Sequence, residues 1–206
     1  AFIPVRGGSK SIPLKNIKPL FGEPLVLWVL KAALESNIYD KIIISTDHNE
    51  IKRVVETFDS RILVISRTEK VSNDTASTES TLLEFSQHYD FETITLIQAT
   101  SPLLSAKDLK GAYQHFLNDE IDSLLSVVKQ KRFIWEHLRK NVYQPTNYNP
   151  SKRPRRQDQT GYFVENGAFY MTSKVLLDQS QTRISGKIGI YEMAEDTFYE
   201  IDEPSD

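Results

Sequence analysis

The sequence predicts an α/β fold, in which a mostly parallel sheet carries helices on both faces and a small β-rich flap. Three observations lead to this prediction. Short apolar runs alternate with amphipathic segments over the first 130 residues, as repeated strand–helix–strand units do. Glycine-containing and polar stretches follow directly after apolar runs. After residue 130 the alternation stops, and strand-like runs replace the helical pattern.

The strands expected for the sheet are short and rich in β-branched residues, which is typical of strands buried on both faces. They span residues 1–5, 41–46, 61–66, 93–99 and 122–128. The helices expected between them span residues 23–36, 49–58, 78–89 and 106–119, where apolar residues recur at helical spacing. Together these elements predict a three-layer, Rossmann-like arrangement, with the helices divided between the two faces of the sheet.

The second part of the chain predicts a β-rich flap and the last strands of the sheet. Residues 133–145 are typical of a strand pair or an extended arm, and residues 145–161 of a basic, proline-containing loop. Strand-like runs return at residues 162–172, 187–193 and 197–202. We expect one domain, 1–206, within which about residues 130–160 form an extended flap or dimerisation arm.

Composition and charge exclude several classes of protein. The 206 residues include no cysteine, which excludes disulfides, thiolate catalysis and zinc–thiolate sites. A formal net charge of −3 argues against a protein that coats nucleic acid. No apolar run approaches the roughly 20 residues of a membrane-spanning helix, and no signal peptide is recognisable. We therefore expect no nucleic-acid partner, no membrane association and a cytoplasmic location.

The loop after the first strand has the composition of an anion-binding turn. Residues 6–16 read RGGSKSIPLKN, so two glycines are followed by two serines and two lysines. This is neither a Walker A motif nor a dinucleotide-binding fingerprint, because the glycine spacing differs. Glycines allow backbone N–H groups to approach an anion closely, while Arg6, Lys10 and Lys15 supply charge, Ser9 a hydroxyl and Asn16 an amide. The loop therefore predicts phosphate binding; the alternative is a solvated basic turn.

Polar residues also follow three later strands. In STDHNEI (45–51), Asp47 or Asn49 is suited to cap the helix that follows. The polar loop 66–78 contains one arginine, and QATSP (98–102) places a glutamine and two hydroxyls at a strand end. Ligands of parallel sheets bind beyond the carboxyl ends of the strands, so these stretches are expected to share one site with residues 6–16.

Two further clusters suggest anion and metal binding. SKRPRRQD (151–158) is the densest positive cluster, and it fits a nuclear-import or nucleic-acid patch, a solvated loop, or a site for an anionic carboxylate or phosphate. In YEIDEPSD (199–206), Glu200 and Asp202 are two residues apart in an extended run, so both point to the same side. Such a pair suits Mg²⁺; the alternative is a charged strand end with a turn at Pro204. The four histidines have no ligand spacing.

Taken together, RGGSKSIPLKN, STDHNEI, SNDTAST, QATSPL, KRPRRQD and ENGAFY resemble the CMP-sialic acid synthetases, or acylneuraminate cytidylyltransferases. The resemblance runs from Arg6 to Asp206, and KRPRRQD followed by ENGAFY is especially similar to the animal-type members. It implies that CTP and a nine-carbon 2-keto sugar acid such as N-acetylneuraminate give a CMP-sugar and pyrophosphate, with Mg²⁺ as cofactor. It also implies a homodimer or higher homo-oligomer in which the flap reaches the partner.

The same resemblance implies roles for particular residues. The CTP-binding positions are Arg6, Gly7, Gly8, Ser9, Asn16, Arg67, Ala76 and Thr78. The sugar-acid positions are Gln98, Gln157 and Asn166, the catalytic positions are Lys15, Arg155 and Arg156, and the metal-binding positions are Asp202 and Glu200. Two departures from the family pattern are Leu104, where many bacterial members have arginine, and Glu200, where the family usually has aspartate.

Other functions fit the same residues. The substrate could be another 2-keto sugar acid, such as deaminated sialic acid (KDN), pseudaminic acid or KDO, and the difference at Leu104 leaves this open. A protein of another class, a non-catalytic nucleotide-binding or nuclear protein, would use KRPRR as an import or contact surface. The animal-type resemblance also implies the nucleus or Golgi as alternatives to a cytoplasmic location.

Overall fold

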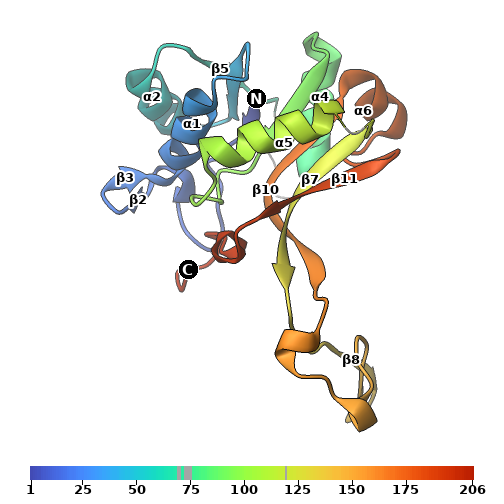
Figure 1. Cartoon of the computed structure of the whole chain (residues 1–206). Coiled ribbons are helices and arrows are strands. Elements are labelled where there is room, and N and C mark those ends of the chain that lie inside the picture. The colour runs from blue at the N-terminus through green and yellow to red at the C-terminus, as the bar shows by residue number, and fades with distance from the viewer. Residues whose placement is uncertain (69–70, 72–75, 119) are drawn as a thin grey trace.

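A computed structural model of the chain describes residues 1–68, 71, 76–118 and 120–206. Its centre is a seven-stranded sheet with the order β11-β7-β10-β6-β1-β4-β5 (Figure 1). The strands are β1 (Phe2–Pro4), β4 (Ile42–Thr46), β5 (Ile62–Ser66), β6 (Thr93–Ile97), β7 (Ser123–Gln130), β10 (Tyr162–Ser173) and β11 (Ile188–Met193). Neighbouring strands are parallel except that β10 runs antiparallel to both β6 and β7. The predicted mostly parallel sheet is confirmed.

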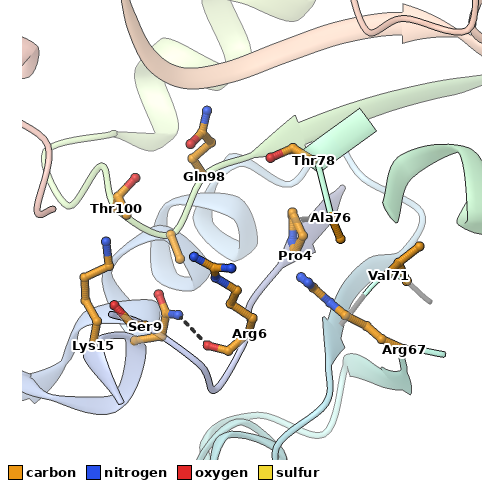
Figure 2. Close-up of a pocket in the computed structure, with 12 residues that line it drawn as sticks. Pro4, Arg6, Ser9, Lys15, Arg67, Val71, Ala76, Thr78, Gln98 and Thr100 are labelled. Atoms are coloured by element: carbon orange, nitrogen blue, oxygen red, sulfur yellow. Dashed lines mark hydrogen bonds between the residues drawn. The ribbon is translucent and has the colours of Figure 1, made fainter. Parts of the chain in front are cut away.

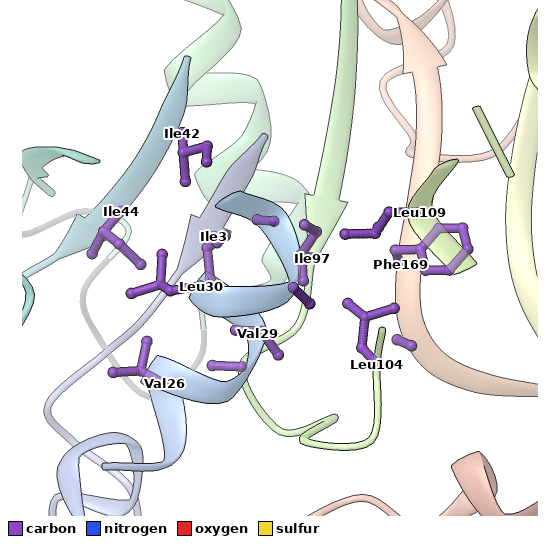
Figure 3. Close-up of a cluster of buried hydrophobic side chains, with 14 of the residues drawn as sticks. Ile3, Val26, Val29, Leu30, Ile42, Ile44, Ile97, Leu104, Leu109 and Phe169 are labelled. Atoms are coloured by element: carbon purple, nitrogen blue, oxygen red, sulfur yellow. The ribbon is translucent and has the colours of Figure 1, made fainter. Parts of the chain in front are cut away.

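Helices cover both faces of this sheet and make the three predicted layers. They are α1 (Leu25–Ser36), α2 (Asn49–Phe58), α4 (Thr78–His88), α5 (Ala106–Asn118) and α6 (Lys174–Ser180). One apolar cluster joins α1, α2 and α5 to the sheet, and a second joins α4 and α6 to its other face. Because side chains alternate along a strand, Ile42 and Ile44 of β4 enter the first cluster and Ile43 enters the second. Figure 3 shows α1 packed on β1 and β4 in the first cluster.

Two small antiparallel hairpins stand apart from the main sheet. One consists of β2 (Pro19–Leu20) and β3 (Glu23–Pro24), and α1 begins directly after it at Leu25. The other consists of β8 (Trp135–Arg139) and β9 (Val142–Pro145) and belongs to an arm of residues 131–161. Figure 1 shows this arm projecting away from the sheet at the end of β7 and β10. It also contains the short 3₁₀ helices η2 (Pro150–Lys152) and η3 (Arg156–Asp158).

Two details of the sequence prediction are wrong. The strand expected at 197–202 is instead the 3₁₀ helix η4 (Glu195–Phe198) followed by irregular chain. The backbone N–H and the hydroxyl of Thr197 both donate to the carbonyl of Ala194, at 3.0 and 2.6 Å, which closes a turn where a strand would be extended. The N-cap of α2 is His48 rather than Asp47 or Asn49, since its Nδ1 accepts the N–H of Glu50 at 3.3 Å.

Parts of two predicted segments lie outside the residues that the structure describes. Residues 69–70 and 72–75 of the polar loop 66–78, and residue 119 at the end of a predicted helix, lie outside the described residues. Within the described ranges, no helix is both long and apolar enough to cross a membrane. The cytoplasmic location stays a prediction.

Candidate active site

A cavity of about 280 Å³ opens at the carboxyl ends of β1, β5 and β6 (Figure 2). Its lining comes from the loop after β1, from the segment between β5 and α4, and from the turn after β6. The lining residues are Pro4, Arg6, Ser9, Lys15, Asn16, Arg67, Val71, Ala76, Thr78, Gln98, Ala99 and Thr100. The cavity therefore lies at the edge of the sheet where a parallel α/β protein is expected to bind its ligand.

Hydrogen bonds to its neighbours hold the glycine loop in place. The N–H of Gly7 donates to Oδ1 of Asp47 at 2.8 Å, and Nδ2 of the buried Asn16 donates to the carbonyl of Arg6 at 3.1 Å (Figure 2). A Cβ on Gly7 would lie only 2.6 Å from Cδ2 of His48, so the loop packs against the start of α2 through this missing side chain. Gly8 has no atom of a described residue within 4 Å of its Cβ position. The two glycines thus have different surroundings, and neither lines the cavity.

Three cationic side chains, those of Arg6, Lys15 and Arg67, line the cavity. Arg67 is held in place by its Nε, which donates to the carbonyl of Ser45 at 3.0 Å. Burial lowers the pKa of Arg67 to about 10; the carboxylate of Asp47 opposes this shift and the charge of Arg6 adds to it. Arg67 still carries its charge at neutral pH. A half-buried cation beside a second cation costs free energy, so this part of the cavity favours an anionic ligand.

The acidic C-terminal segment lies against the same loop. Nζ of Lys15 forms an ion pair with Oδ1 of Asp202 at 2.7 Å, and the hydroxyl of Ser11 donates to Oε1 of Glu203 at 3.0 Å. The half-buried carboxyl of Glu200 has a raised pKa, chiefly because of burial and then because of the charge of Asp202, while Lys15 opposes the shift. The carboxylates of Glu200 and Asp202 therefore lie near each other, and Asp202 contacts the cavity-lining Lys15.

The donor set fits a divalent metal ion that is shared with a ligand. In the part of the chain that the structure describes, no group of three or more His, Asp and Glu side chains is arranged to hold a metal ion alone. Mg²⁺, however, is commonly bound by one or two carboxylates, several waters and the phosphates of a substrate. Glu200 and Asp202 could supply the carboxylates, because they lie two residues apart and Asp202 contacts the cavity-lining Lys15.

The structure brings together most of the residues proposed for CTP and one of those proposed for the sugar acid. Arg6, Ser9, Lys15, Asn16, Arg67, Ala76, Thr78 and Gln98 line one cavity. Asp202 joins them through Lys15. Pro4, Val71, Ala99 and Thr100 also line it and were not assigned from the sequence. Thr100 had a signal in QATSP; Pro4, Val71 and Ala99 had none, because an apolar side chain is equally expected in the core.

Other residues proposed for the site lie elsewhere in the chain. Arg155, Arg156 and Gln157 lie in or next to η3 of the arm and do not line the cavity of their own chain. Nε of Arg155 pairs with Oδ2 of Asp158 at 2.7 Å, and its side chain is 74% exposed. Asn166 is buried behind the cavity, where its Nδ2 donates to Oγ1 of Thr197 at 3.1 Å. Among the described residues that line the cavity of this chain, none of these four is found, and their roles stay predictions.

Comparison with known proteins agrees with this geometry. A family model described as cytidylyltransferase matches residues 1–206. N-acylneuraminate cytidylyltransferase A of Danio rerio is 43% identical over 98% of this chain, and N-acylneuraminate cytidylyltransferase of Oncorhynchus mykiss is 40% identical over 98%. The chain spans 47% of the length of each of these two relatives. Pseudaminic acid cytidylyltransferase of Campylobacter jejuni is 31% identical over 86% of this chain and 79% of its own length.

Solved structures share the fold at low sequence identity. A CMP:2-keto-3-deoxy-manno-octonic acid synthetase complexed with CTP has a TM-score of 0.70 at 18% identity, over 99% of this chain and 92% of that one. A 4-diphosphocytidyl-2C-methyl-D-erythritol synthase from Anaerococcus prevotii has a TM-score of 0.71 at 13% identity, over 99% and 93%. The sequence match over the whole chain, the sheet topology and the cationic cavity agree, and this chain belongs to the cytidylyltransferase family.

Proposed function

We propose that this chain transfers CMP from CTP to the anomeric hydroxyl of a sialic acid, N-acetylneuraminate, and releases pyrophosphate. One observation carries the proposal: Arg6, Lys15 and Arg67 converge with Gln98 in one cavity at the carboxyl edge of the sheet. The names of the relatives at 40–43% identity support the choice of substrates.

The cationic end of the cavity is suited to the triphosphate. Arg6 and Lys15 would bind phosphate oxygens by charge-assisted hydrogen bonds, with the hydroxyl of Ser9 as a further donor. Asn16 would act by fixing the backbone of Arg6, to which its amide is bonded. Arg67, Ala76 and Thr78 would contact the cytidine. The reaction then needs little beyond positioning and charge neutralisation, as in other phosphoryl transfers.

The sugar acid would enter at the Gln98 end of the cavity. Its anomeric hydroxyl would attack the α-phosphorus in line with the leaving pyrophosphate. The new O–P bond forms, the bond between the α-phosphorus and the oxygen that bridges to the β-phosphate breaks, pyrophosphate leaves with that oxygen, and the hydroxyl proton passes to solvent. Mg²⁺ held by Asp202 and Glu200 would neutralise phosphate charge and lower the pKa of the attacking hydroxyl. Lys15 belongs to the phosphate loop and pairs with Asp202 in the structure, so it links that loop to the carboxylates that would hold the metal.

The identity of the sugar acid and of the nucleotide is decided by one experiment. Pyrophosphate release is measured with each of the four NTPs, with and without Mg²⁺, against N-acetylneuraminate, KDN, pseudaminic acid and KDO. We expect CTP and N-acetylneuraminate to give the highest kcat/KM. A higher kcat/KM for another acid would change the substrate but keep the reaction class. CTP binding without pyrophosphate release from any acid would contradict the proposal and favour a non-catalytic nucleotide-binding protein.

We also propose that the chain acts as a homodimer in which each arm completes the site of the other copy. Several large apolar side chains of the arm are about half exposed, among them Trp135, Leu138 and Tyr143. The arginines of η3 sit on the same arm, away from the cavity of their own chain. Burying the apolar side chains against a second copy would stabilise the dimer by roughly 25 cal/mol per Å² of apolar area, and it would bring Arg155 and Arg156 to the partner's cavity.

Mixing two impaired variants tests this arrangement. Lys15→Ala removes a cavity residue and Arg155→Ala removes an arm residue, so each homodimer should keep no more than about a tenth of the wild-type activity. After random exchange of subunits, half of the dimers are mixed, and in each of these one site carries neither change. Activity should therefore return to about a quarter of the wild-type level. A mixture that stays at the activity of the separate variants, with subunit exchange verified by tagged copies, would contradict the exchange of arms.

A further inference from the structure

The middle of β10 passes directly beside the cavity, and its geometry is irregular there. The pairing of β10 with β7 shifts in register between Glu165 and Tyr170. On the other side of β10, the N–H of Gln98 donates to the carbonyl of Ala168 at 3.0 Å. The irregular part of β10, which includes Asn166 and Gly167, is therefore hydrogen-bonded through the next residue, Ala168, to the backbone of the cavity-lining Gln98.

Gly167 leaves room for the Glu200 carboxylate. A Cβ on Gly167 would overlap Oε1 of Glu200, and it would lie 3.0 Å from Cδ of Glu200 and 3.5 Å from Nε2 of Gln98. Gly167 also has a φ of +67°, a conformation that other residues adopt only with strain. The space that a side chain would need is thus taken by the Glu200 carboxylate, next to the Gln98 amide.

Asn166 fixes the turn that leads to Glu200. It is 2% exposed, and its Nδ2 donates to the carbonyl of Thr197 at 3.3 Å and to its hydroxyl at 3.1 Å. Thr197 lies in η4, three residues before Glu200. Just after Glu200, the N–H of Ile201 donates to the carbonyl of Thr100 at 2.9 Å. Glu200 is therefore held between two anchors, one from β10 and one from the lining of the cavity.

We propose that Asn166 and Gly167 are positioning residues for Glu200: Asn166 fixes the turn before it, and the missing side chain at Gly167 seats its carboxylate beside Gln98. In this arrangement Asn166 and Gly167 act on the site through Glu200, which is an alternative to the direct sugar contact expected for Asn166. The expected effect on turnover rests on the proposed function, whereas the placement of the Glu200 carboxylate by Asn166 and Gly167 does not.

A thermal-unfolding cycle tests the geometry without reference to activity. Gly167→Ala is made in the wild-type chain and in a Glu200→Ala chain. We expect it to lower the Tm of the wild-type chain by several degrees more than that of the Glu200→Ala chain, because the overlap disappears with the carboxylate. Gly22→Ala is the matched control for backbone strain, since Gly22 has a φ of +88° and, among the described residues, no atom within 4 Å of its Cβ position. An equal drop in both chains would overturn the role of Gly167.

Kinetics test the consequence for catalysis. We expect Asn166→Ala to lower kcat about tenfold with little change in KM for CTP, because misplacing a reacting group affects turnover more than binding. Thr197→Ser, which keeps the acceptor hydroxyl, should restore near wild-type kcat relative to Thr197→Val. Asn166→Ala should add nothing to the loss caused by Glu200→Ala. If Asn166→Ala lowered kcat by the same factor in the wild-type chain and in the Glu200→Ala chain, the positioning role of Asn166 would be overturned. A wild-type chain that forms no CMP-sugar would refute the proposed function, and the unfolding cycle would still decide the geometry.

Discussion

The two adjacent glycines of the phosphate loop should respond differently to the same substitution. In Gly7→Ala, the new Cβ would lie 2.6 Å from Cδ2 and 2.8 Å from Cβ and Cγ of His48. Carbon atoms in contact prefer about 3.5–4.0 Å, so the loop and the start of α2 must separate. The His48 ring cannot move freely, because its Nδ1 accepts the N–H of Glu50 and caps α2. Gly8→Ala meets no atom within 4 Å in the part of the chain that the structure describes.

The two substitutions should affect different quantities, Gly7→Ala the stability of the fold and Gly8→Ala the binding of CTP. Overpacking of this kind costs about 1–3 kcal/mol. For a chain of this length, each kcal/mol lowers Tm by about 2–4 °C, so Gly7→Ala should lower Tm by about 2–12 °C. Gly8→Ala should change stability by no more than about 0.5 kcal/mol. If the N–H of Gly8 binds a phosphate, a side chain there weakens one charge-assisted hydrogen bond, and kcat/KM for CTP falls about 10- to 100-fold.

The assay combines thermal unfolding followed by circular dichroism with pyrophosphate release at varied CTP concentration. We expect Gly7→Ala to reduce Tm, and Gly8→Ala to keep Tm and reduce kcat/KM. A Gly7→Ala protein that melts at the wild-type temperature would show that the loop does not pack on His48 as described. A Gly8→Ala protein with wild-type kinetics would refute close approach of the phosphates to this part of the loop.

Three further predictions concern the charged groups around the cavity. Lys15→Met should reduce kcat/KM for CTP about 10- to 100-fold through loss of a charge-assisted hydrogen bond, with little change in Tm. The control is Lys31→Met, which breaks the ion pair between Lys31 of α1 and Glu23 of β3 and should leave the kinetics unchanged. Glu200→Gln should be more stable than wild type at pH 7 and should lose this advantage as the pH falls towards the ordinary carboxyl pKa of 4.5. The folded carboxyl has a raised pKa, so the wild-type chain has its full stability below pH 4.5 and loses stability as the pH rises from 4.5 through the raised pKa. Urea unfolding at several pH values measures this change. Chelation by EDTA should abolish CMP-sugar formation, and added Mg²⁺ should restore it. Asp202→Asn should raise the Mg²⁺ concentration needed for the half-maximal rate. A rate of CMP-sugar formation that does not depend on EDTA would contradict a metal at Asp202.

The sequence predicted the layers of the fold because strand burial leaves a clear pattern. Ile42, Ile43 and Ile44 form an unbroken apolar run, and the structure places them alternately on the two buried faces of the sheet. The shared cavity followed from topology, since carboxyl ends of parallel strands meet at one edge. This argument brought Arg6, Arg67 and Gln98 together, although they are far apart in the sequence.

The features that the sequence did not predict depend on contacts between distant segments. Residues 197–202 have strand-like composition, but Thr197 closes a turn onto Ala194 and bonds to Asn166 across the fold. The β2–β3 hairpin has only the Phe21–Gly22 step as a signal, and both residues adopt positive φ there. The fit of Glu200 into the space beside Gly167 joins two positions that no local pattern connects.

The attachment of the arm restricts how its length can vary among related proteins. Tyr162 of β10 pairs with Gln130 of β7 at the base of the arm, so both connections continue strands of the central sheet. Each residue in a strand adds about 3.4 Å and turns the next side chain to the opposite face. Deleting one residue from each strand would present the wrong surface to a neighbouring molecule, while deleting two from each would keep the surface and shorten the reach by about 7 Å. Insertions and deletions at this base should therefore occur in matched, even numbers.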